Sequence, residues 1–183
     1  MNRVWFRSLA VALFCIALGC APTTPPAAEA PALNGVFRDE VLSRLDALQE
    51  RVVSLAEAMP EDRYTWRPAE GVRSVSELYL HFTGANFGLA GTFGATAPEG
   101  AVPGNDVTDK AAITAALGAS FEHLKGAIQG VSASSADEMV TLFGREMTTR
   151  QALWTLTEHL SEHLGQGIAY ARVNGVVPPW NVE

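Results

Sequence analysis

The histidines are the residues of this chain best suited to chemistry. There are four, and two of them, His159 and His163, lie four positions apart. On a helix this spacing puts both imidazoles on one face, one turn apart, where both rings can bind one metal ion. His81 also lies among apolar residues, with Leu78 and Phe82 near it. His81, His159 and His163 are therefore candidates for one shared site.

The apolar neighbours of these three histidines predict helix faces that are turned toward a core. An unsatisfied buried polar group costs roughly 1–3 kcal/mol, so each ring needs a partner. One divalent ion would satisfy all three rings, and three separate hydrogen bonds would do so as well. The fourth histidine, His123, has charged residues on both sides, which predicts a solvent-exposed helix face.

The first twenty residues resemble an export signal. Two arginines accompany an apolar stretch of 11 residues, 8–18. This stretch is shorter than the roughly 20 residues that span a bilayer, so we predict a signal peptide over residues 1–19. Its end, Ala17–Cys20, resembles a bacterial lipobox, so we expect Cys20 to be lipidated. Ordinary secretion with a cysteine nearby is the alternative.

Residues 20–34 are rich in proline and alanine and predict a tether between a lipid anchor and a domain over residues 35–183. The expected location is the outer side of a membrane, periplasmic or at the cell surface. Of the two cysteines, Cys15 would leave with the signal and Cys20 would carry lipid. No thiol would remain for a disulfide, a thiolate metal site or a cysteine nucleophile.

The domain shows apolar residues at helical spacing in four segments. Proline, glycine and capping residues bound each segment. A short extended piece is predicted at 139–143, and capping boxes are predicted at Ser74/Glu77 and Thr148/Gln151. The four predicted helices are Gly35–Met59, Ser74–Phe93, a helix capped by Thr108 that runs to Gly130, and Thr149–Val173.

Four amphipathic helices of about 20 residues predict an all-α fold, a four-helix bundle. The links before the third and fourth helices are each about 15 residues long, which is uncommon unless a link crosses the bundle or covers a site. The net charge of −7 argues against a nucleic-acid partner, which would need a basic surface. Bundles of this kind often pair, so a homodimer is the oligomer to test.

Two groups of motifs lie around these histidines. The first consists of Met59–Asp62, Tyr64–Pro68, Ser74–Leu78, His81 and Asn86, and the second of Glu158–Gln166, Tyr170–Gly175 and Val177–Pro179. Together they resemble the DinB-like domains, a family of DinB/YfiT-like metalloenzymes. The likeness covers about 35–179 and implies a four-helix bundle with long crossover links. It also implies a metal held by one histidine of the second helix and a His-x3-His pair of the fourth, here His81, His159 and His163.

Three imidazoles leave at least one coordination position for water or substrate, which is the arrangement of catalytic sites. Zinc, nickel, iron and manganese all accept imidazole, so the ligand set does not choose among them. Near the ligands, Asn86 and Gln166 could orient a histidine or contact a substrate. Trp66 and Tyr170 could line a pocket, although core packing explains them equally well.

Two kinds of chemistry are open to such a site when a small-molecule substrate binds. A metal-activated water would make the protein hydrolase-like. A thiol bound at the open position would make it an S-transferase or isomerase, as in some DinB-like relatives, although low-molecular-weight thiols are chiefly cytoplasmic. The sequence does not identify a general base, because Glu158 and Glu162 point away from the ligand face. A non-catalytic metal-binding or interaction lipoprotein is the remaining alternative.

Overall fold

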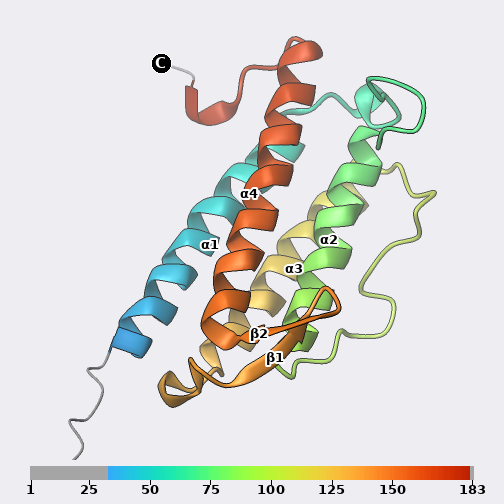
Figure 1. Ribbon diagram of the computed structural model, residues 1–183. Coiled ribbons are helices and arrows are strands. Elements are labelled where there is room, and N and C mark those ends of the chain that lie inside the picture. Colours follow the sequence, from blue (N-terminus) through green and yellow to red (C-terminus); the bar gives the residue numbers. More distant parts are fainter. Residues whose placement is uncertain (1–32, 182–183) are drawn as a thin grey trace, which may run out of the picture. The chain divides into compact units, whose positions relative to one another are not determined.

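The computed structural model describes residues 33–181, so the predicted signal peptide, Cys20 and nearly all of the tether lie outside the described residues. Four long helices form the domain, and the predicted four-helix bundle is confirmed (Figure 1). Three short 3-10 helices and one two-stranded hairpin complete the described part. The elements are α1 (Leu33–Ala58), α2 (Val75–Thr92), α3 (Lys110–Gln129), β1 (Met139–Leu142), β2 (Arg145–Thr148) and α4 (Thr149–Val173), with 3-10 turns at Glu61–Arg63, Ala133–Ser135 and Pro179–Asn181.

In the bundle, α1 and α2 each pack against both α3 and α4. The ammonium of Lys110, at the start of α3, donates to the carbonyls of Glu57 and Met59 at the end of α1, so these two helices are antiparallel. Tyr170, near the end of α4, reaches the carbonyl of Arg73 just before α2, so α2 and α4 are also antiparallel. The Tyr64 hydroxyl donates to the carbonyl of Ala56 near the end of α1, and the Tyr64 carbonyl accepts from the amide of Ser76 at the start of α2, so α1 and α2 are antiparallel too. The helices α2 and α3 are therefore parallel, and the link between them runs back along the bundle (Figure 1).

The helix starts follow the predicted capping chemistry with one exception. The Ser74 hydroxyl accepts from the Glu77 amide and the Glu77 carboxylate accepts from the Ser74 amide, as predicted. The box at Thr148 is likewise present and starts α4. The predicted cap of α3, Thr108, is wrong, because the adjacent Asp109 accepts from the Ala112 amide at 2.7 Å.

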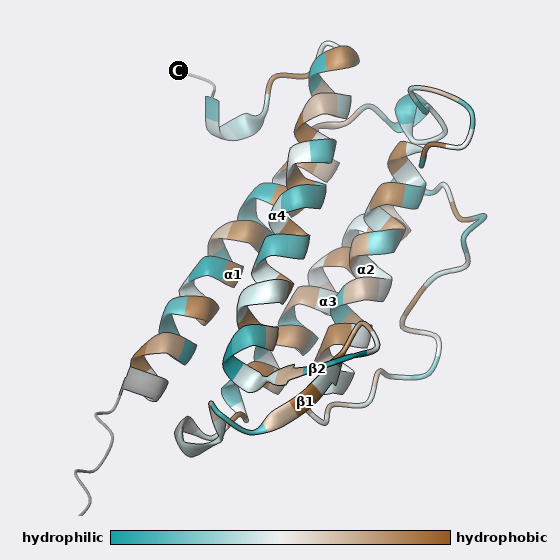
Figure 2. Cartoon of the chain, in the orientation of Figure 1, coloured by the Kyte–Doolittle hydropathy of each residue, from teal (hydrophilic) through white to brown (hydrophobic). Residues whose placement is uncertain are grey.

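The core lies between the four helices and consists mainly of leucine, with buried phenylalanine and tyrosine. Polar and apolar residues alternate along each helix, as Figure 2 shows. Burying one such side chain stabilises the fold by about 1.5–3 kcal/mol. No helix in residues 33–181 is long and apolar enough to cross a membrane. Fully buried members include Leu45, Leu48, Leu55, Leu78, Phe82, Ile113, Leu117, Phe121, Leu156 and Leu160.

The link between α3 and α4 carries a feature that the sequence showed only in part. The predicted extended piece is β1, which pairs antiparallel with β2, a strand that the sequence analysis missed. Two residues, Phe143 and Gly144, connect the strands, and both have positive φ, at 51° and 72°. Type I′ turns have this pattern but favour Asn-Gly or Gly-Gly, so Phe-Gly gave a weak signal.

Candidate metal centre

The three histidines singled out in the sequence lie together in the structure. His81 comes from α2, and His159 and His163 come from consecutive turns of α4. One nitrogen from each ring lies within 4.8 Å of the other two. The Nε2 atoms of His81 and His163 are 2.9 Å apart. This is a compact group of three imidazole donors that could hold one ion.

Close packing of α4 against its neighbours brings these histidines together. Gly167 is buried four residues after His163, where α4 faces the core. A methyl group at Gly167 would lie 3.4 Å from Cδ2 of Leu55 on α1 and 3.7 Å from Cδ2 of Leu78 on α2. These are ordinary van der Waals separations, so the Gly167 face of α4 packs directly against both helices, one turn beyond His163.

A chain of hydrogen bonds holds the His163 ring from behind. Its Nδ1 lies 3.1 Å from Oε1 of Gln166, whose amide nitrogen donates to the Tyr170 hydroxyl at 2.7 Å. That hydroxyl donates to the carbonyl of Arg73 at 2.9 Å. Because the amide oxygen can only accept, the proton of His163 must be on Nδ1. The lone pair of Nε2 then faces Nε2 of His81, 2.9 Å away, and is the atom of His163 that is available to bind a metal.

The His159 ring provides the test of whether this site fits a metal. Its Nε2 is buried and has no hydrogen-bond partner in residues 33–181. Such an atom costs about 1–3 kcal/mol when nothing satisfies it. The His81 and His163 rings lie 5.5 and 4.6 Å from this ring, between centroids, and both contacts are edge-on. A cation bound between the three rings would satisfy the orphaned nitrogen, so the donor set fits a divalent ion.

Electrostatics favour the neutral form of the ligands. Partial burial lowers the pKa of His81 to about 4, and the nearby Arg73 charge and the other two histidines add to this shift. Burial, followed by the His163 charge, lowers the pKa of His159 as well, although the Glu162 carboxylate opposes the shift. At neutral pH both rings are neutral, which is the state that binds a metal ion.

The other residues named from the sequence divide into two groups. Gln166 and Tyr170 belong to the series of hydrogen bonds that holds His163. The Trp66 ring packs edge-on against the Tyr170 ring, with 5.4 Å between centroids. Asn86 is elsewhere, since it is fully buried and its amide donates to Ser120 on α3. Trp66 is half-buried against the core, so its contacts are those of packing. Glu158 and Glu162 are exposed, as expected.

The prediction that His123 lies on a solvated face is wrong. Its ring is half-buried and lies 5.1 Å from the Phe87 ring, between centroids. Its Nε2 is also buried without a hydrogen-bond partner in the described part of the chain. Charged neighbours in sequence were a poor guide, because they point to other sides of the helix.

Both long links reach the cluster, in line with the expectation that they cross the bundle or cover a site. Phe143, at the tip of the hairpin, lies 5.3 Å from the His159 ring, between centroids. On another side, the link between α2 and α3 contributes Val102 and Asn105 to a pocket of about 440 Å³ that His81 also lines. Arg73 lines the same pocket, and neither Arg73 nor Phe143 was singled out in the sequence.

Comparisons with known proteins agree with this geometry. A family model described as the DinB superfamily matches residues 44–166. A DinB-like protein from Bacillus subtilis is 24% identical, with a TM-score of 0.61 over 75% of this chain and 93% of that one. A DinB-like protein from Bacillus cereus is 19% identical, with a TM-score of 0.63 over 79% and 97%. These two likenesses concern the fold, and the search of curated proteins found no match.

Proposed function

This chain belongs to the DinB superfamily, and we propose that it is a divalent-metal-dependent enzyme of hydrolase-like activity on a small-molecule substrate. The observation that carries this proposal is the convergence of His81, His159 and His163, with a buried, unpartnered nitrogen on His159. When bound there, a divalent ion would supply the Lewis acidity that lowers the pKa of water to near neutrality. Zinc, nickel, iron and manganese all suit three imidazoles.

The residues of the chain have distinct parts in this proposal. Gln166 holds His163 in the tautomer that presents Nε2 to the site. Tyr170 fixes Gln166 in turn, so the ligand orientation does not depend on solvent. The hairpin tip with Phe143 shields His159, while the pocket beside His81 gives a small molecule access to the cluster.

A non-catalytic metal-binding protein is the second candidate, and one observation favours it. Glu77 is the only carboxylate among the described residues that line the pocket beside His81. It accepts hydrogen bonds from Arg67 and from the Ser74 amide, so it is poorly suited to take a proton from water. In a hydrolase, the proton of the attacking water would therefore have to pass to the substrate itself, or be released through the effect of the metal alone.

For the location we propose an exported lipoprotein, anchored through Cys20 and a Pro/Ala-rich tether. Support comes from the sequence of residues 1–34, of which 1–32 lie outside the described part. Anchoring outside the cytoplasm would separate the protein from most low-molecular-weight thiols, which favours water over a thiol as nucleophile.

The test combines metal content with turnover. We expect elemental analysis to find about one divalent ion per chain in the wild type and none in His159→Ala, because a catalytic site of this kind depends on each of its three ligands. His123→Ala, a histidine outside the cluster, should keep its metal. Simple chromogenic esters, amides and phosphoesters, each with and without added cysteine as the thiol, then separate the reactions.

The outcomes distinguish the candidates. Metal-dependent hydrolysis that needs no thiol supports the hydrolase. Turnover only with cysteine replaces it with the thiol-dependent S-transferase or isomerase. Stoichiometric metal without turnover replaces it with the non-catalytic protein. Equal metal in the wild type and His159→Ala would contradict the site itself.

A further inference from the structure

We propose that the pocket beside His81 binds an anionic group of the substrate, a carboxylate or a phosphate, through the guanidinium of Arg73. The proposal rests on the proposed function in one respect: the part of the substrate that reacts would do so at the three histidines. The anion site itself is made by residues outside the histidine cluster, so it can be tested separately.

The pocket is shaped to admit a ligand next to His81. Gly84 and Ala85 follow His81 by three and four positions and therefore lie on the same side of α2. Their small side chains leave space beside the imidazole, and the link between α2 and α3 closes that space with Val102 and Asn105. The resulting pocket of about 440 Å³ is large enough for a small carboxylate or phosphate compound.

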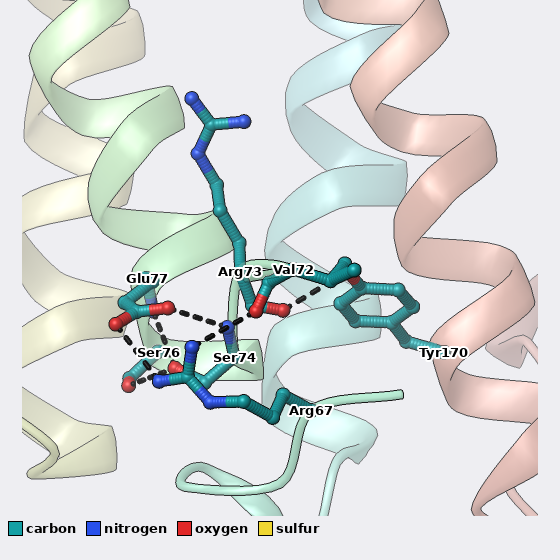
Figure 3. A network of polar contacts seen from close by, with 7 residues as sticks. All are labelled: Arg67, Val72, Arg73, Ser74, Ser76, Glu77 and Tyr170. Atoms are coloured by element: carbon teal, nitrogen blue, oxygen red, sulfur yellow. Dashed lines mark hydrogen bonds and ion pairs between the residues drawn. The ribbon is translucent and has the colours of Figure 1, made fainter. Parts of the chain in front are cut away.

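Arg73 is an available cation at this pocket. Its side chain makes no hydrogen bond or ion pair within residues 33–181, whereas nearby Arg67 is paired with the Glu77 carboxylate at 3.0 Å and the Val72 carbonyl at 2.9 Å. Figure 3 shows the Arg73 guanidinium extending away from this network, alongside α2. A free guanidinium presents planar N–H donors that match carboxylate and phosphate oxygens.

The single acidic side chain that lines the pocket does not neutralise Arg73. The Ser74 amide and the Arg67 guanidinium bind the Glu77 carboxylate and lower its pKa (Figure 3). The positive charge of Arg73 meanwhile lowers the pKa of His81 and of His159, which places the guanidinium within electrostatic reach of the cluster. An anion on Arg73 would therefore sit beside the histidines.

Hydrogen bonds connect the backbone of Arg73 to the histidine cluster. Its carbonyl accepts from the Tyr170 hydroxyl, which is linked through Gln166 to His163. These hydrogen bonds fix the position of the Arg73 backbone relative to His163. A substrate anchored by its anionic group would then present a neighbouring bond to the cluster at a constant separation, which is how binding energy becomes orientation.

The experiment titrates the full-length protein, metal-free and zinc-loaded, with benzoate, inorganic phosphate and the neutral analogue benzamide in a calorimeter. We expect Arg73→Gln to bind both anions about 10-fold or more weakly, with benzamide binding and metal content unchanged. Arg67→Gln removes the same charge from a paired arginine nearby and should bind anions like the wild type. Arg73→Lys should retain part of the affinity.

A second pair of variants tests the pocket without altering charge. Gly84→Leu should fill the space beside His81 and abolish anion binding. Gly88→Leu, one turn later, points a side chain into open space and should have no effect. Unchanged anion affinity in Arg73→Gln or Gly84→Leu, or an equal loss in Arg67→Gln, would overturn the proposal. Because the metal-free titration measures Arg73 alone, failure of the metal site would be seen separately in the zinc content.

Discussion

Gln166 accepts a hydrogen bond from Nδ1 of His163 at 3.1 Å, three residues earlier on the same helix. This one contact decides which nitrogen of the imidazole is free to bind a metal. It is also the first of three hydrogen bonds that tie the cluster to the start of α2.

Gln166→Leu should weaken zinc binding by about 10- to 100-fold, because it removes the acceptor that orients His163 while keeping the side chain's size. Gln166→Glu keeps an acceptor for the Nδ1 proton and should restore most of the affinity. Competition with a chromophoric chelator measures both. If the leucine variant bound zinc as tightly as wild type, the contact would have no role in ligand orientation.

The turn at Phe143 stores backbone strain next to His159. A bulky residue at a φ of 51° is disfavoured by about 1–2 kcal/mol relative to glycine, whereas asparagine tolerates it. Since Phe143 as a whole residue is 57% exposed, its replacement loses little burial. We expect Phe143→Asn to stabilise the metal-free protein by about 1 kcal/mol in urea unfolding.

The adjacent residue supplies the control for that measurement. Gly144 has a φ of 72°, and a methyl group added there would have no neighbouring atom within 4 Å, so Gly144→Ala changes backbone preference alone. It should destabilise the protein by about 1 kcal/mol. A loss of stability in Phe143→Asn would instead mean that the ring's contact with His159 outweighs the strain.

The stability of the metal-free protein should fall as the pH drops from about 6.5 to about 4. In the unfolded chain His81 binds a proton with an ordinary pKa of about 6.5, while burial and Arg73 lower it to about 4 in the fold. The unfolded state thus binds more protons in this window, and stability is lost as the pH falls through it. The loss is about 2 kcal/mol, at about 1.4 kcal/mol per pKa unit and allowing for partial exposure.

Urea unfolding at several pH values measures this dependence. His81→Asn removes the titrating ring and should flatten the curve between pH 4 and 6.5, leaving the part due to His159. If the free energy of unfolding changed equally steeply with pH in wild type and variant, His81 would not be the group responsible for the loss of stability.

Cys20→Ser should release the protein from the membrane fraction, because acyl chains on Cys20 would be its anchor. Cys15→Ser changes the other cysteine, which would leave with the signal peptide, and should remain membrane-bound. Fractionation followed by detection of the protein measures both. Persistence of Cys20→Ser in the membrane fraction would contradict the lipobox interpretation.

Local sequence rules predicted the parts of the structure that depend on near neighbours. The apolar spacing on each helix, the capping boxes at Ser74 and Thr148, and the shared face of His159 and His163 all follow from helical periodicity within a few residues. The cap of α3 was misassigned by one residue, since Thr108 and Asp109 are both good capping residues and only the chain path chooses between them.

Contacts between distant segments were beyond such rules. The strand that pairs with β1, the burial of His123 against Phe87 and the bond from Tyr170 to Arg73 join residues on different elements. Their formation depends on helix order and close packing, which no local pattern encodes.

The sequence alone determined that there are four amphipathic helices, with three histidines on their inner faces that could bind a metal. It could do so because side-chain chemistry and helical periodicity are local properties. The resemblance to DinB-like domains added the expectation that these histidines share one site. The fold determined the rest: which nitrogen of His163 faces the site, that His159 has an unpartnered nitrogen there, and that Arg73 points its charge along α2. These features depend on distances and burial, which arise only when the helices pack.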